Sequence, residues 1–75
     1  MTVREAVGQL ATLLEARTLE GVLSGASALE RGDRRGARLI LRHATELRRL
    51  ASYRGAAVEV LLSAAGAARP QEEAT

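Results

Sequence analysis

The sequence predicts an all-α protein, on three observations. Leucine, alanine, arginine and glutamate, which all favour helices, dominate its 75 residues. No window alternates β-branched or aromatic residues with polar ones, as a half-buried strand would. Apolar residues recur instead at intervals of three and four, the spacing of one helix face. A chain of this length forms one domain at most, and we expect that domain to span residues 1–68.

The first helix is expected to begin at Val3. Thr2 and Glu5 match the capping box, in which a threonine precedes a glutamate by three residues. The apolar stripe that follows consists of Val3, Val7, Leu10 and Leu14. This stripe predicts one apolar face of a helix.

Beyond Ala16 the apolar stripe changes direction. A second stripe, consisting of Leu19, Val22, Leu23, Ala26 and Leu29, lies well over a quarter turn from the first. Either the helix breaks near Thr18, or one helix runs from Val3 to Arg31 and contacts neighbours on two faces. In the second case the first stripe continues onto Gly21, Gly25 and Ala28, whose small size would let another helix approach closely.

A tight reversal is predicted at Arg31–Asp33. Glycine suits the left-handed residue after a helix end, as at Gly32, and aspartate suits the N-cap of the next helix. The tripeptide Arg-Gly-Asp is explained better by such a turn than by integrin binding.

The second half of the chain predicts another amphipathic helix from Arg34 to about Ala67. Its apolar face consists of Leu39, Ile40, His43, Ala44, Leu47, Leu50 and Ala51, and resumes at Val58, Leu61, Leu62 and Ala65. Arg54 falls within that face and Gly55 follows it, so the helix either kinks there or runs on. Residues 69–75 contain Pro70 and two acids and no apolar anchor, which predicts a disordered tail.

The predicted architecture is therefore an antiparallel helical hairpin of two long helices. The alternative is a three- or four-helix bundle with breaks near Thr18 and Gly55. A lone hairpin hides less apolar surface than these stripes offer, and exposed stripes usually mark an interface. The chain has no cysteine and one histidine, so extra stability is expected from a partner or from self-association rather than from disulfides or a metal.

The composition disfavours several other classes. No secretory signal or membrane-spanning stretch is visible, which predicts a cytoplasmic protein. No cofactor motif, metal-ligand cluster or catalytic constellation is found, so enzyme activity is not expected. His43 shares a face with leucines, and Glu46 is expected on the opposite face, so His43 is interpreted as a packed histidine rather than a general base.

Arginines form a row on the polar side of the second helix. All eleven bases of the chain are arginine, and Arg35, Arg38, Arg42 and Arg49 fall in one narrow sector. Such a row could bind phosphates. Three observations favour a solvated face instead. Glu46 lies within the row, it is predicted to pair with Arg42, and the chain lacks aromatics for base stacking.

The turn "ALERGDRRGA" and its flanking leucine pattern resemble the small helical-hairpin chaperones of bacterial flagellar and type III export systems. The resemblance covers about Leu13 to Ala65. It implies a protein that masks an export subunit through the apolar face of the second arm. The arginine richness and the pair Gly21 and Gly25 depart from those families, and no motif residue carries over.

The leading hypothesis is a non-enzymatic interaction module: a chaperone, an adaptor or a small assembly subunit. It would bind a partner helix, or its own copy, through exposed apolar faces. The partner-binding residues predicted from the stripes are Leu47, Leu50, Val58, Leu61, Leu62, Val7, Leu10 and Leu14. The alternative is a small arginine-rich nucleic-acid-binding protein that uses Arg35, Arg38, Arg42 and Arg49.

Overall fold

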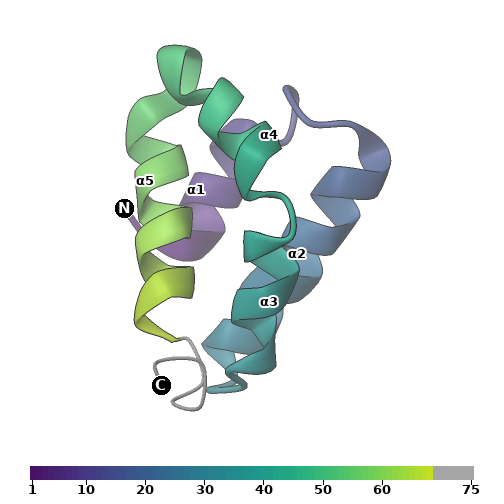
Figure 1. The fold of residues 1–75 in the computed structure, drawn as a ribbon, viewed down its shortest axis with the longest axis vertical. Coiled ribbons are helices and arrows are strands. Elements are labelled where there is room, and N and C mark those ends of the chain that lie inside the picture. Colours follow the sequence, from purple (N-terminus) through teal and green to yellow (C-terminus); the bar gives the residue numbers. More distant parts are fainter. Residues whose placement is uncertain (69–75) are drawn as a thin grey trace.

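The prediction of an all-α protein is confirmed. A computed structural model describes residues 1–68, and in that range it contains helices and no strand. The helices are α1 (Val3–Leu10), α2 (Ala16–Glu30), α3 (Arg35–Leu41), α4 (Ala44–Arg49) and α5 (Ala51–Ala67), as Figure 1 shows. The predicted disordered tail, residues 69–75, lies outside the described residues.

Neither arm of the predicted hairpin is one continuous helix, a point that the sequence left open. The first arm breaks after Leu10 and resumes at Ala16, and the second breaks at Arg42–His43 and again at Leu50. An unbroken helix over residues 3–31 would be about 44 Å long, whereas the longest dimension of the molecule is 33 Å. The physical reason is burial of the apolar stripes. The two stripes of the first arm point in different directions, so both can face one core only if the helix is broken between them.

Of the two helix breaks considered in the alternative architecture, the one near Gly55 is found and the one at Thr18 is not. Thr18 does not begin a helix, because it lies inside α2 and is buried. Arg54, directly before Gly55, has non-helical backbone angles (φ −142°, ψ 49°) inside α5. Of the two possibilities left open at this position, a kink or a continuous helix, the structure therefore has the kink. The break in the first arm lies between Leu10 and Ala16, before Thr18.

The reversal at Arg31–Asp33 is confirmed. Gly32 has a φ of +78°, the left-handed conformation that glycine adopts at little cost. The backbone N–H groups of Gly32 and Asp33 donate to the carbonyls of Leu29 (3.0 Å) and Ala28 (2.8 Å), which satisfies the end of α2. The chain therefore turns directly from α2 into α3.

Helices α2 and α3 meet backbone to backbone, at Gly25 on α2 and Gly36 on α3. A Cβ atom added to Gly25 would lie 2.8 Å from the carbonyl oxygen of Gly36, and one added to Gly36 would overlap the carbonyl oxygen of Gly25. The same added atom on Gly36 would lie 2.8 Å from the Cβ of Ala28. The structure therefore has a close helix approach at Gly25 and Ala28, which the sequence left open, although the unbroken first arm to which it was tied is not found.

Both apolar stripes of the first arm contribute to one core. Helix α1 packs against α2 and α5, while α3 packs against α2 and α5, and α4 against α5. The largest fully buried side chains come from every helix: Val7, Leu10, Val22, Ile40, Leu47 and Leu61. In Figure 1, α4 connects the upper end of α3 to α5. The core is therefore closed by short helices set at angles to one another.

Candidate functional site

The predicted partner-binding residues mostly lie in the core. Val7, Leu10, Leu47, Val58 and Leu61 are buried, each with at most 3% of its surface exposed. Leu14, Leu50 and Leu62 are half-buried and pack against the same core. The expectation that these eight side chains form exposed docking faces is wrong for the five buried ones, because the additional helix breaks turn them inward.

Other large apolar side chains remain exposed. Leu13, Leu23 and Tyr53 expose 42%, 47% and 70% of their surfaces. None of these three was among the predicted partner-binding residues. Leu23 belongs to the second stripe of the first arm, so the periodicity contained the signal, but periodicity alone does not say which edge of a stripe stays outside.

Leu23 borders a hollow between α1 and α2. This hollow has a volume of about 230 Å³, and it is lined by Arg4, Val7, Leu23, Ala26, Ser27 and Glu30. Its apolar lining comes from facing sides of two helices that pack together. It therefore offers an apolar floor flanked by an exposed leucine and two charged side chains.

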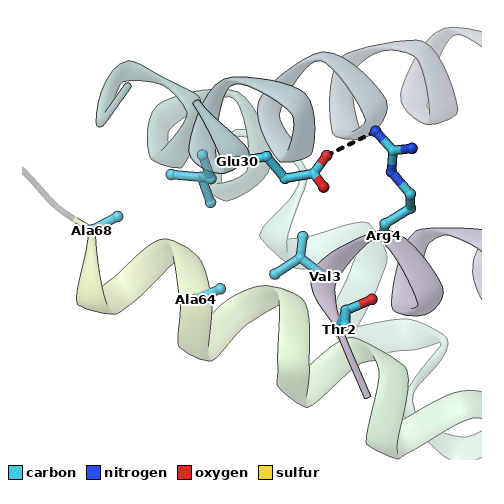
Figure 2. A pocket seen from close by; sticks show the side chains of 7 residues that line it. Thr2, Val3, Arg4, Glu30, Ala64 and Ala68 are labelled. Atoms are coloured by element: carbon cyan, nitrogen blue, oxygen red, sulfur yellow. Dashed lines mark hydrogen bonds and ion pairs between the residues drawn. The ribbon is translucent and has the colours of Figure 1, made fainter. Parts of the chain in front are cut away.

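A second hollow adjoins the first at the end of the helices. It has a volume of about 340 Å³, and its lining residues are Thr2, Val3, Arg4, Leu29, Glu30, Ala64 and Ala68. Figure 2 shows Arg4 of α1 and Glu30 of α2 reaching toward one another, with the Nη2 and Oε1 atoms 3.0 Å apart. Because Arg4 and Glu30 line both hollows, the two together form one surface, which we name the α1–α2 groove.

The capping box at Thr2 holds one end of the α1–α2 groove. The backbone N–H of Glu5 donates to the Thr2 hydroxyl at 3.1 Å, and the backbone N–H of Thr2 donates to the Glu5 carboxylate at 2.9 Å. The bond from the Thr2 backbone N–H to the carboxylate, and after it the Thr2 side chain, hold the pKa of Glu5 below its ordinary value. The prediction from the sequence is confirmed, and it fixes Val3 and Arg4 in the first turn of α1.

The arginine row is divided by the helix break. Arg35, Arg38 and Arg42 are spaced three and four residues apart on or next to α3 and are exposed, whereas Arg49 belongs to α4. Residues 31–54 hold eight arginines and two acids, a formal net charge of +6. Because the whole chain carries +2, the remaining residues carry −4. We name the exposed arginines of residues 31–49 the α3–α4 basic surface.

Asp33, one of the two acids in this region, contacts Arg35 at the start of α3. Its carboxylate accepts from the side chain of Arg35 (Nε and Nη2, each at 3.0 Å) and from the backbone N–H of Arg35 at 3.0 Å. The pKa of Asp33 is lowered, first by the side-chain bonds to Arg35 and then by the backbone bond. The predicted N-cap role of Asp33 is wrong by one residue, because the N-cap of α3 is Arg34, which makes no side-chain cap bond. The Asp33 carboxylate still accepts from the backbone N–H of Arg35 in the first turn of α3.

Glu46, the other acid, turns toward α2. The Thr18 hydroxyl donates to Oε2 of Glu46 at 2.9 Å, and Nδ1 of His43 lies 3.8 Å from Oε1. The prediction that His43 and Glu46 occupy opposite faces is wrong, because the two residues are three positions apart at the start of α4, a spacing that places side chains on the same side of a helix. Likewise, the carboxylate of Glu46 is engaged with Thr18 and His43, where a pair with Arg42 was predicted.

This polar contact joins α4 to α2. His43 also covers Gly21, where an added Cβ would lie 2.8 Å from the imidazole Nε2. The buried Thr18 hydroxyl donates to the carboxylate of Glu46, which links the middle of α2 to the first turn of α4. We interpret Thr18, His43 and Glu46 as a structural tie that positions α4.

Within residues 1–68, no three His, Asp or Glu side chains gather as metal ligands would. No helix of that range has the length and apolarity needed to cross a membrane. The chain matches no family model, no curated protein and no solved structure.

Proposed function

We propose that this protein is a non-enzymatic helical interaction module that binds an amphipathic helix in the α1–α2 groove. The helix would belong to a partner protein or to another copy of the chain. The observation that carries the proposal is Leu23, which is 47% exposed and sits beside an apolar floor formed by Val7 and Ala26. An apolar side chain of the bound helix would cover Leu23 and fill the hollow beside it.

The α1–α2 groove has the features of a helix-binding surface. Its floor is apolar along the pairing of α1 and α2, and its charged groups, Arg4 and Glu30, are of opposite sign. Helix-in-groove recognition uses apolar anchors on one face of the bound helix and polar contacts at the edge. Covering the exposed part of one leucine contributes about 1 kcal/mol, so several such contacts are needed for useful affinity.

A chaperone, an adaptor or a small assembly subunit would use this surface in the same way. The resemblance to export chaperones favours a role in covering an apolar helix of a subunit before its export, which places the proposed activity in the cytoplasm. The contact surface now differs from the one that the resemblance implied, since the leucines of the second arm are largely internal.

Site-specific cross-linking tests the proposal. A photo-reactive amino acid replaces Ser27, which lines the α1–α2 groove, and in a second sample replaces Ser52, an exposed residue of α5. In the cells that make the protein, we expect discrete protein adducts from position 27, their loss in a Leu23→Asp background, and none of these adducts from position 52. Equal adduct patterns from both positions would contradict the proposal.

A second candidate function is binding of nucleic-acid backbone by the α3–α4 basic surface. The observation in its favour is that Glu46, the acid within the arginine row, is engaged by Thr18 of α2. The predicted neutralisation of the row by Glu46 is thereby reduced. A net charge of +6 within residues 31–54 suits phosphate contacts, whose strength falls with salt.

A salt titration with a generic DNA duplex tests this second function. Binding at low salt that falls steeply toward physiological salt, and that is lost when Arg35, Arg38, Arg42 and Arg49 are replaced by glutamine, would support it. No binding at low salt would exclude it. Leu23→Asp serves as the control, because it should leave duplex binding unchanged.

A further inference from the structure

We infer that the occupant of the α1–α2 groove is a second copy of this chain, related by a twofold axis. The inference rests on the proposed function, since it names the helix that the groove binds. The two copies would place α1 and α2 of one against α1 and α2 of the other. Leu23 of each copy would lie in the hollow beside Leu23 of its neighbour.

Self-complementarity is the first argument. In a twofold interface the same patch meets itself, so each copy must supply both members of every contact. The α1–α2 groove supplies an apolar projection at Leu23 and an apolar floor at Val7 and Ala26. It also supplies one positive and one negative side chain, Arg4 and Glu30, whose charges cancel.

Charge distribution is the second argument. The α3–α4 basic surface lies in a segment of net charge +6, and two copies facing one another there would repel. The α1–α2 groove is instead neutral at its centre, and residues 1–30 hold two arginines and four acids, a net charge of −2, so a second copy can approach it at a smaller cost. Of these two surfaces, the charge-balanced one is suited to self-association, and the basic one stays accessible in a dimer.

The Arg4–Glu30 pair gives the dimer a definite geometry. Both side chains are exposed, and a 3.0 Å contact within one chain at the surface contributes little by itself. Around a twofold axis, Arg4 can equally pair with Glu30 of the second copy, and the symmetry forms that pair twice. Exchange of these ion pairs between copies leaves the net number of pairs unchanged while the apolar surface around Leu23 becomes covered.

The decisive experiment mixes two charge-reversed chains. Arg4→Glu places two acids in the groove, and Glu30→Arg places two bases there, so each variant alone should dimerise about fivefold to tenfold more weakly. In an equimolar mixture, the acidic groove of one variant faces the basic groove of the other, opposite charges meet across the interface, and a heterodimer of wild-type strength should form. Sedimentation of each variant alone and of the mixture measures this, with circular dichroism confirming that the helices are retained.

A second comparison isolates the apolar contact. Leu23→Asp should weaken dimerisation by roughly tenfold or more. Leu13→Asp, at a leucine of similar exposure outside the residues that line the groove, should leave it unchanged. A wild-type chain that sediments as a monomer at about 1 mM, or charge variants whose mixture shows no recovery, would overturn the inference.

Cross-linking from position 27 keeps the two proposals distinguishable. Adducts of twice the chain mass support the second copy as occupant. Adducts with a different protein, together with a monomeric chain in sedimentation, overturn the inference and leave the proposed function standing. Absence of any adduct specific to position 27 overturns both.

Discussion

The contact between α2 and α3 and the contact between α1 and α5 are built by opposite means. At the first, Gly25 and Gly36 let two backbones touch, and no side chain fits between them. At the second, bulky buried side chains such as Leu10 and Leu61 fill the space. Gly8 and Gly66, on α1 and α5, face nothing within 4 Å of an added Cβ. Gly8 and Gly66 are exposed, so glycine is required where two backbones touch and dispensable on the exposed sides of α1 and α5.

The largest expected loss of stability comes from a substitution in the contact that side chains fill. Leu61→Ala should destabilise the fold by about 2–5 kcal/mol, because it removes buried apolar surface and leaves a cavity. Leu62→Ala, at the half-buried neighbouring position, should cost clearly less. Chemical denaturation of both variants measures the difference. Equal losses would show that Leu61 is not part of the closed core.

The next largest loss of stability is expected from a substitution at the backbone contact between α2 and α3. Gly36→Ala should destabilise the fold by about 1–3 kcal/mol, because the new methyl group overlaps the backbone of Gly25 and helices α2 and α3 must separate. The gain in helix propensity is too small to offset this overlap. Urea unfolding provides the measurement, and a Gly36→Ala variant as stable as the wild type would show that the two backbones do not touch.

A smaller effect of opposite sign sharpens the comparison. Gly8→Ala should stabilise the protein by about 0.5–1 kcal/mol, since alanine favours the helix and the added methyl group meets no atom. Gly66→Ala, in α5, provides an independent copy of the same test. The three alanine variants at Gly8, Gly66 and Gly36 thus differ only in what the new Cβ meets. Destabilisation at Gly8 would contradict the open surroundings found there.

The smallest expected effect is a loss of stability at low pH. Glu5 in α1 and Asp33 at the α2–α3 turn both have lowered pKa values in the folded protein. A lowered pKa contributes stability above the ordinary values of 4.5 and 3.8, and that stability is lost as pH falls through the folded pKa. Both carboxylates are exposed, so the effect should be modest.

Glu5→Gln and Asp33→Asn test this at the two regions separately. Each variant should be less stable than the wild type at pH 7, and the difference should shrink as the pH falls and the wild-type carboxylate becomes protonated. Thermal unfolding across this range measures it. A difference that stays constant with pH would assign the effect to lost hydrogen-bond geometry instead of charge.

Much of the local structure was predictable from the residues. The capping box at Thr2 and the reversal at Gly32 each depend on a few neighbouring residues, and each is confirmed. The candidate site was not predictable in the same way. The stripes correctly marked Leu47 and Leu61 as apolar-face residues, but whether such a face meets solvent or the same chain depends on where the helices break.

The amino-acid order by itself determined that the chain is helical, where it starts its first helix and where it reverses, because helix propensity, capping and turn conformation are local properties. Only the tertiary structure decided that five of the eight predicted docking side chains are internal and that Leu23 remains outside. It also decided that Glu46 turns to Thr18, 28 residues away. Periodicity gives a direction relative to one helix axis, and packing alone sets the angles between axes.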